Sequence, residues 1–449
     1  MSVVSNYVTA GAGNVATNPT DASGNPVYSG VPSRAKSVII FGDSITANNT
    51  SSGGAFNYAP ANGYWNWANA LLGQRYKLLR NAGIGGNWTS DMLNRLYSDV
   101  LFYRPDIVVV LGGTNDISNN VPVATTITNL TTIYERILST GSSVVAMTIL
   151  PRAAAGITTA QRNRLMQINN WIREYTYTRP NIILCDAFFA FADASNATSD
   201  PVTTYTSDGL HPNSIGARVV GNELYKVLNV LTPASNRSVN GQADVFDATD
   251  NPTGNMMVNG MLQILGASSG TGFAGNNPNN FTIQRLAGTS TWTGSTNART
   301  DGYPGNWYRA AITGGTLATE QFEFRQNLSG PTAGGTTYQI GDQLYAEVEL
   351  NVTVSGTTPY INQLCLQTVE YDRDGNAVMS TASIYKNGTE KQLSSNFSGV
   401  FRTPVFTTTG SAGVGASQRV TVSLQVIFDG TISTSVTIDI ARMSVRKAS

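Results

Sequence analysis

The chain has 449 residues, of which 41% are hydrophobic and only 12% are charged, so it can bury sizeable cores beneath a polar but weakly charged surface. Its 28 basic and 28 acidic side chains cancel. No basic run offers the phosphate-neutralising surface that nucleic-acid binding requires, so we expect no nucleic-acid partner. A length well above that of one typical domain predicts two domains with connecting segments.

The N-terminal segment, residues 1–35, is rich in Gly, Asn, Thr and Pro and shows no sustained periodicity, which predicts an extended arm. It lacks the basic region followed by a long apolar stretch that marks a secretion signal. No run approaches the roughly 18 apolar residues that a membrane helix needs. The sequence therefore predicts no signal peptide and no membrane span.

Residues 36–232 alternate short β-branched runs with longer amphipathic stretches. Near-continuous apolar runs such as I-V-V-V-L are typical of strands that are covered on both faces. The predicted strands are Ser37–Phe41, Tyr76–Asn81, Asp106–Leu111, Ser143–Leu150 and Asn181–Cys185. The predicted helices are Tyr64–Leu72, Ser90–Asp99, Ala124–Ser139, Thr158–Tyr177 and Ser214–Val230. This rhythm predicts a parallel α/β domain.

The remaining sequence changes character twice. Residues 233–259 lose all periodicity, which predicts a linker. Residues 260–449 carry period-2 runs, in which every second residue is apolar, between Gly- and Asn-rich turns. This pattern predicts an antiparallel β-sandwich, of jelly-roll type. Because its surface is polar and nearly uncharged, the domain suits a carbohydrate-binding or receptor-binding role, although an architectural role fits the same composition.

The two cysteines, Cys185 and Cys365, lie in different halves of the chain inside apolar runs. We expect buried free thiols, since two cysteines allow neither a disulfide framework nor a four-ligand zinc site. The run D-R-D-G-N at 372–376 faintly resembles a calcium loop but is better explained as a hairpin turn. We predict no metal and no cofactor.

Polar motifs follow the predicted strands, at the edge of an open α/β sheet where reactive groups gather. F-G-D-S-I-T places Ser44 after the first strand, and N-A-G-I-G-G-N leaves backbone N–H groups free after the second. G-G-T-N-D offers the amide of Asn115 after the third strand. S-D-G-L-H-P-N, before the last helix, carries Asp208 and His211, the only histidine.

These residue types match acyl transfer through serine, which needs a nucleophile, a base, an orienting carboxylate and donors for an oxyanion. Each motif alone has a plainer explanation. Ser44 by itself is a common helix cap, Asn115-Asp116 a turn, and Gly85-Gly86 a flexible loop. Their occurrence together and in order favours catalysis.

In this order the motifs resemble the blocks of the SGNH (GDSL-like) hydrolase family, over roughly Lys36 to Leu231. The resemblance implies a three-layer α/β/α, flavodoxin-like domain. It also implies a triad of Ser44, His211 and Asp208. The oxyanion-hole donors that it implies are the backbone N–H groups of Ser44 and Gly86 and the amide of Asn115.

The sequence departs from the commoner family pattern at two places. Ile45 replaces the Leu of the name-giving motif, and Ala47-Asn48 replaces a glycine often found there. The stretch Asn48–Asn62 is longer and richer in Gly and Ser than a minimal connection. Neither replacement touches a catalytic atom, whereas the longer stretch changes the expected shape of the cleft beside Ser44.

Three aromatic residues, Trp88, Trp65 and Tyr64, fall near the first two motifs. They are candidates for an acyl or sugar platform, although aromatic residues near a domain's first helix are more often core. We therefore do not count them among the site residues.

The resemblance implies hydrolysis of a carboxylic ester. The appended β-domain and the low charge favour deacetylation of a polysaccharide, so an acetylated glycan or another ester is the expected partner. A second hypothesis is a phage tail-fibre or tailspike protein whose esterase fold is secondary, with residues 1–35 attached to the virion. That hypothesis predicts a homotrimer, and it favours a virion or extracellular location.

Overall fold

A computed structural model describes residues 36–232, 241–266, 270–303, 305–315, 319–331, 337–354, 360–388, 391–393, 395–409, 413, 415, 418–429 and 436–448. Lys36–Ser449 cluster as one compact unit. The predicted N-terminal arm, residues 1–35, and residues 233–240 of the predicted linker lie outside the described residues.

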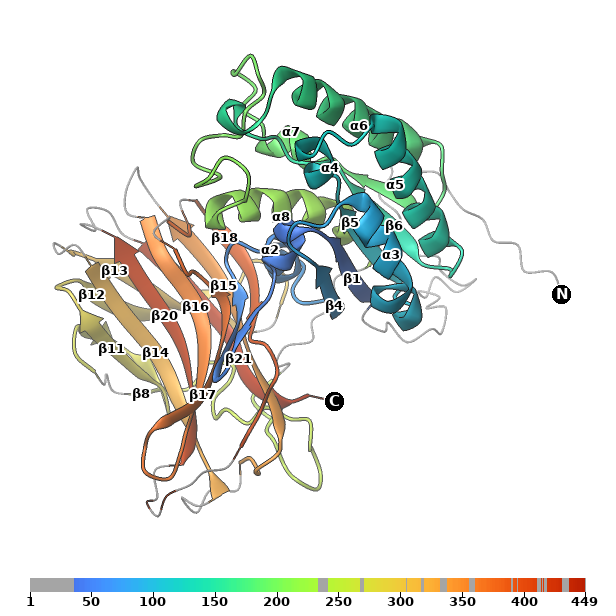
Figure 1. Cartoon of the computed structure of the whole chain (residues 1–449). Helices are drawn as coiled ribbons and strands as arrows, with labels where there is room; N and C mark the ends of the chain where they lie inside the picture. Colours follow the sequence, from blue (N-terminus) through green and yellow to red (C-terminus); the bar gives the residue numbers. More distant parts are fainter. Residues whose placement is uncertain are drawn as a thin grey trace, which may run out of the picture. The chain divides into compact units, whose positions relative to one another are not determined.

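A five-stranded parallel sheet forms the centre of the first half of this unit (Figure 1). Its strands are β1 (Ser37–Gly42), β4 (Lys77–Gly83), β5 (Ile107–Leu111), β6 (Ser143–Met147) and β7 (Ile182–Cys185). They lie in the order β4-β1-β5-β6-β7, which is the flavodoxin-like order 2-1-3-4-5. The predicted α/β fold is confirmed.

Helices cover both faces of this sheet, which explains its near-continuous apolar strands. The long helices are α2 (Tyr64–Leu71), α3 (Thr89–Asp99), α5 (Val123–Leu138), α6 (Thr159–Tyr177) and α8 (Ser214–Asn229). Shorter helical segments are α1 (Ser44–Ala47), α4 (Thr114–Ser118), α7 (Ala187–Phe191), Leu101–Tyr103 and Ala154–Gly156.

Successive residues of each strand enter different apolar clusters. Ile39 and Phe41 pack with residues of α3, α5 and α6, whereas Val38 and Ile40 pack with residues of α2 and α8. Because side chains alternate between the faces of a strand, β1 supplies both clusters at once. The sheet is thereby held from both sides, and its carboxyl edge stays free for loops.

Two seven-stranded sheets form the other half of this compact unit. One has the order β11-β14-β20-β16-β17-β3-β2, and the other has the order β18-β15-β21-β13-β12-β9 with β19 paired to β15. Their strands are β2 (Ser51–Gly53), β3 (Phe56–Pro60), β9 (Phe273–Gly275), β11 (Thr282–Ala287), β12 (Thr291–Ala298), β13 (Asn306–Thr313), β14 (Thr319–Ser329), β15 (Gln343–Val354), β16 (Tyr360–Tyr371), β17 (Ala377–Tyr385), β18 (Phe397–Arg402), β19 (Phe406–Thr407), β20 (Arg419–Asp429) and β21 (Val436–Lys447). A small ribbon joins β8 (Leu265–Gly266) and β10 (Asn277–Pro278).

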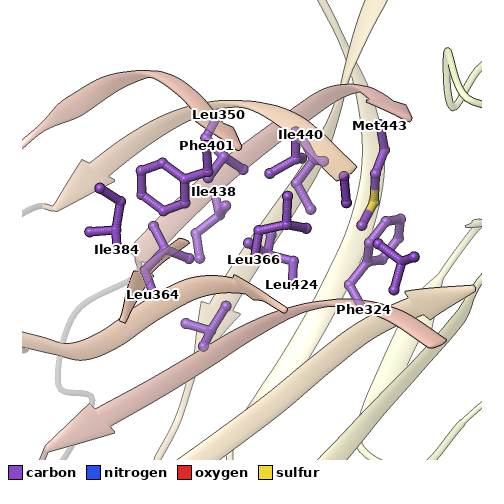
Figure 2. Close-up of a cluster of buried hydrophobic side chains, with 14 of the residues drawn as sticks. Phe324, Leu350, Leu364, Leu366, Ile384, Phe401, Leu424, Ile438, Ile440 and Met443 are labelled. Atoms are coloured by element: carbon purple, nitrogen blue, oxygen red, sulfur yellow. The ribbon is translucent and has the colours of Figure 1, made fainter. Parts of the chain in front are cut away.

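The period-2 runs produce the core between these sheets. In β15 the apolar residues Leu344, Ala346, Val348, Leu350 and Val352 are all fully buried. Figure 2 shows part of the core, to which both sheets contribute, with Phe324, Leu364 and Leu424 from one sheet and Leu350, Phe401 and Ile440 from the other. The predicted β-sandwich is confirmed.

The long stretch Asn48–Asn62 folds as the hairpin β2–β3 and leaves the α/β half to join the sandwich. β3 pairs in parallel with β17, from Phe56 opposite Ser380 to Pro60 opposite Tyr385. From α2, Trp67 enters the sandwich core. The two halves predicted from sequence therefore share one sheet and one apolar cluster.

Residues 241–259, for which the sequence predicts a linker, pack against β21. The side chain of Asn255 donates to Met443 O at 3.1 Å and accepts from the N–H of Val445 at 3.0 Å. Met256 and Met257 are buried in the sandwich core. Specific side-chain bonds hold this segment although it shows no periodicity.

Two smaller expectations can be checked in the described residues. Cys185 and Cys365 are buried and free, as predicted. The run 372–376 is a turn between β16 and β17, in which Asp372 Oδ1 accepts from the N–H groups of Asp374 and Asn376. Across the part of the chain that the structure describes, helices are too short or too polar to span a membrane.

Candidate active site

Three side chains, one just after β1 and two from the loop before α8, form a hydrogen-bonded series at the carboxyl edge of the parallel sheet. Ser44 Oγ lies 2.9 Å from His211 Nε2, and His211 Nδ1 lies 2.7 Å from Asp208 Oδ2. Because an ionised carboxylate can only accept, Nδ1 carries the proton between His211 and Asp208, and Nε2 is left to accept from the Ser44 hydroxyl. The structure thus brings together the three residues predicted as nucleophile, base and orienting carboxylate.

Ser44 is the first residue of α1, which sits directly on the sheet edge. A Cβ atom on Gly83 would lie 2.2 Å from Ala47 N, and one on Gly42 would lie 2.2 Å from Leu111 O. Neither position has room for a side chain, so glycine allows α1 to approach the end of β4 and allows β1 to lie close to the end of β5. This close approach fixes the place of the Ser44 hydroxyl.

The loop before α8 orients the imidazole. Asp208 Oδ1 accepts from the N–H groups of His211 and Leu210, at 2.7 and 2.9 Å, and Gly209 O accepts from Ala153 N at 2.9 Å. Partial burial raises the pKa of the Asp208 carboxyl, but the hydrogen bonds from the His211 ring and from these backbone groups outweigh it and lower that pKa well below its usual range. Asp208 therefore stays anionic near neutral pH.

The predicted oxyanion donors lie in the two neighbouring loops. Gly86 has φ +78°, in the left-handed region that favours glycine, and no described residue accepts a hydrogen bond from its N–H. The Asn115 amide donates to Asn87 O at 3.0 Å, which leaves its second hydrogen for another acceptor. The N–H of Ser44 begins a helix and so has no intrahelical partner.

Asp116 fixes the positions of these donor loops relative to one another, a role that the sequence did not predict. It is 1% exposed and accepts from the N–H and the hydroxyl of Thr89, at 2.9 and 2.5 Å, and from the Thr126 hydroxyl at 3.3 Å. These bonds join the starts of α3, α4 and α5. The position of Asn115 relative to the Gly86 loop depends on them.

Arg95 of α3 is a second positioning residue that sequence reasoning missed. Its guanidinium donates to Gly42 O and Ala82 O, both at 2.8 Å, and to Asn87 Oδ1 at 2.7 Å. It also lies over the ring of Phe41, 4.7 Å from the centroid. In the sequence it shows only an i,i+4 pairing with an aspartate, which resembles any exposed helix pair. In the structure it joins the ends of β1 and β4.

Asp43 places a nearly fully buried carboxyl beneath the site. Its Oδ1 accepts from the N–H of Ile45 at 3.0 Å, and its Oδ2 has no hydrogen-bond partner among the described residues. Burial raises the pKa of Asp43 to about 6, and the Ile45 N–H and the charge of His211 act in the opposite direction. When ionised, Asp43 stabilises a positive charge on the His211 ring. In the sequence, the only indication that Asp43 lies at the site was its position in the motif G-D-S-I, directly before Ser44.

The three aromatic residues near the motifs separate into two groups. Tyr64 and Trp65 are 1% and 2% exposed and belong to the core, whereas Trp88 is 39% exposed. Trp88 follows the Gly85-Gly86 turn, and Ile84, which precedes it, is 45% exposed. Trp88 and Ile84 therefore flank the predicted oxyanion loop with apolar surface.

No set of three or more His, Cys, Asp or Glu side chains within the described ranges is arranged to hold a metal ion. The side chains of His211 and Asp208 are 34% and 53% exposed. Water and a substrate can therefore reach the series from solvent.

Comparison with known proteins gives a family match over part of the chain. The sequence profile described as the GDSL-like Lipase/Acylhydrolase family matches residues 40–219. The comparison with curated proteins gives no match.

Similar solved structures include a lipase/acylhydrolase from Enterococcus faecalis, 23% identical, covering 45% of this chain and 99% of that one with a TM-score of 0.37. A GDSL-like lipase from Bacteroides thetaiotaomicron is 20% identical, with coverages of 44% and 89% and a TM-score of 0.35. An acetyl xylan esterase is 25% identical, with coverages of 42% and 98% and a TM-score of 0.35.

Proposed function

Since residues 40–219 form a GDSL-like lipase/acylhydrolase domain, we propose that the chain is a serine esterase with Ser44 as nucleophile, His211 as general base and Asp208 as orienting carboxylate. One observation carries the proposal. The Ser44 hydroxyl, the only imidazole of the chain and an anionic carboxylate form one continuous series of hydrogen bonds, 2.9 and 2.7 Å long.

Acylation begins when Ser44 Oγ attacks the ester carbonyl carbon while His211 Nε2 takes the hydroxyl proton. The carbonyl oxygen becomes an oxyanion, and the imidazolium is stabilised by Asp208. As the tetrahedral intermediate collapses, the bond to the alcohol oxygen breaks and His211 returns the proton to that oxygen. The products of this half are a free alcohol and an acyl-Ser44 ester.

Deacylation repeats these steps with water as the nucleophile. His211 takes a proton from the water as it attacks the acyl carbon, and the collapse returns that proton to Ser44 Oγ while the carboxylic acid leaves. In both halves the N–H groups of Ser44 and Gly86 and the amide of Asn115 stabilise the oxyanion. Donors held in place by the Asp116 and Arg95 contacts need no reorganisation at that moment.

We propose an acetyl ester of a polysaccharide as substrate. The chain is nearly uncharged on balance, and a β-domain is attached to the esterase half by a shared sheet. In this domain β18-β15-β21-β13 lie in one sheet and β14-β20-β16-β17 in the other, an order that we assign to a jelly roll. A module that binds the polymer raises the local concentration of its esters.

The test is acetate release from acetylated polysaccharides, measured beside hydrolysis of p-nitrophenyl esters of increasing acyl length. We expect acetate release from at least one polysaccharide and a fall in kcat/KM as the acyl chain grows. Preference for long acyl chains without acetate release would redirect the proposal to lipids. No hydrolysis of any ester would leave the esterase assignment wrong.

A further inference from the structure

A polar pocket lies where the β2–β3 hairpin meets the sandwich. It has a volume of about 200 Å³ and is lined by Asn48, Thr50, Ser51, Tyr58, Pro60, Asn62 and Asn387. All but one of these residues come from the connection between α1 and α2, and Asn387 comes from the segment after β17. The pocket, which we call the seam pocket, therefore lies between this connection and the segment that follows β17.

The lining of the seam pocket is polar but carries no Asp, Glu, Lys or Arg. The side-chain amides of Asn48 and Asn62 form no hydrogen bond with any described residue, so each can both donate to and accept from a ligand. A charged ligand would find no counter-charge among these residues. Hydroxyl groups of a neutral sugar match paired donors and acceptors of this kind.

Tyr58 supplies a fixed aromatic surface at this place. Its ring stacks on Phe56 with centroids 4.8 Å apart and meets the edge of Tyr385 at 5.0 Å. Its hydroxyl accepts from Asn387 Nδ2 at 3.3 Å. A tyrosine held in this way combines an apolar face with a polar end, as a pyranose ring does.

The seam pocket is also close to the nucleophile along the chain. Asn48 caps α1, and its N–H bonds to Ser44 O. Four residues of helix correspond to about 6 Å along the axis, roughly the scale of one sugar unit. Asn48 therefore brings the lining of the seam pocket to within about one helical turn of the nucleophile along the chain.

We propose that the seam pocket binds a neutral sugar unit of the substrate beside the unit whose ester is cleaved, an inference that rests on the proposed polysaccharide function. The sandwich thereby contributes to substrate choice directly, through Asn387, and not only by holding the polymer nearby. A substrate with a single small alcohol, such as p-nitrophenyl acetate, has no group to occupy the pocket.

The experiment uses the full chain with Asn387→Ala, Asn62→Ala and Tyr58→Phe. Asn163→Ala, on the exposed face of α6, is the matched control. The substrates are O-acetylated xylohexaose, mannohexaose and cellohexaose, compared with p-nitrophenyl acetate. We expect each asparagine variant to lower the ratio of kcat/KM for the best hexasaccharide to that for p-nitrophenyl acetate about 3- to 10-fold, the value of one hydrogen bond. The control should keep the wild-type ratio.

A second measurement does not depend on catalysis. Saturation-transfer NMR with the three unacetylated hexasaccharides should show transfer to at least one of them in the wild type and weaker transfer in Asn387→Ala. Unchanged ratios in both asparagine variants, or no transfer to any hexasaccharide in the wild type, would overturn the seam pocket as a sugar site. If the wild type releases no acetate but transfer is lost in Asn387→Ala, the pocket assignment stands and the proposed deacetylase function fails.

Discussion

The carboxyl edge of the parallel sheet and the interior of the β-sandwich are built in opposite ways. The edge gathers polar groups that are partly exposed or incompletely paired, such as His211 and the Oδ2 atom of Asp43. The sandwich interior consists of apolar side chains from many strands, most of them fully buried. Under the proposed mechanism the first region carries out the reaction and the second supplies stability, so substitutions in each should affect different quantities.

The largest expected effect is on the rate at the sheet edge. His211→Ala removes the only imidazole, and we expect kcat on p-nitrophenyl acetate to fall about 10⁴- to 10⁶-fold. Thermal unfolding should change little, since the side chain is 34% exposed. Full activity of the variant would show that another group is the base.

A smaller rate effect is expected for the oxyanion donor. Asn115→Ala should lower kcat about 10²- to 10³-fold with KM nearly unchanged, because the amide acts on charge that develops in the transition state. Stopped assays over a range of substrate concentrations separate the two constants. A rise in KM with constant kcat would place Asn115 in substrate binding instead.

The sandwich core should respond in stability and not in rate. Leu424 is fully buried between the sheets, and Leu424→Ala should lower the free energy of unfolding by about 2 to 5 kcal/mol. Urea unfolding monitored by fluorescence measures this change, and kcat measured well below the transition should match the wild type. A loss of kcat of tenfold or more in folded protein would contradict the separation of roles.

Asp43 lies at the sheet edge, but its substitution should change stability as well as rate. The reason is that its buried carboxylate lowers the free energy of unfolding. Its pKa rises from an ordinary 3.8 to about 6 in the folded chain. Between these values the unfolded chain releases the proton first, so the free energy of unfolding falls as pH rises from about 4 to 6 and stays lower above that range. Asp43→Asn should remove a penalty of about 2 to 3 kcal/mol at pH 7. It should also lower kcat, since the imidazolium loses a nearby negative charge.

The measurements for Asp43→Asn are urea unfolding at pH 4 and pH 7 and kcat at pH 7. Wild type and variant should differ little at the lower pH and clearly at the higher one. A variant that is less stable at pH 7 would mean that the Asp43 carboxylate makes a net favourable interaction in the folded chain.

Sequence reasoning succeeded where local signals suffice. The predicted helix Tyr64–Leu72 is observed as Tyr64–Leu71, and the predicted strand Asn181–Cys185 as Ile182–Cys185. Ser44 follows β1 closely, whereas Asp208 and His211 lie in the loop before α8, and the sheet topology brings such loops together at the carboxyl edge. Periodicity placed the strands, and the resemblance of the ordered motifs to a known family implied that Ser44 and His211 act together.

The features that the sequence did not predict depend on partners far along the chain. Nothing local to Phe56–Pro60 indicates pairing with β17, and nothing local to Arg95 indicates three acceptors on two strands and a loop. The segment at Asn255 has no periodicity because its order comes from side-chain bonds to β21. Such contacts become visible only when the tertiary structure is known.

The pairing of β3 with β17 also has a consequence for the order in which the chain acquires its structure. A second contact between the two halves, the bond from Gln74 Nε2 to Val400 O in β18, spans 326 residues. A contact of this sequence separation forms late, because a very long loop must close first. During synthesis the chain emerges from its N-terminus at about 5 to 20 residues per second, so the hairpin beside Ser44 waits many seconds for its partner strand. Until β17 arrives, β3 remains an open edge at which another chain can add.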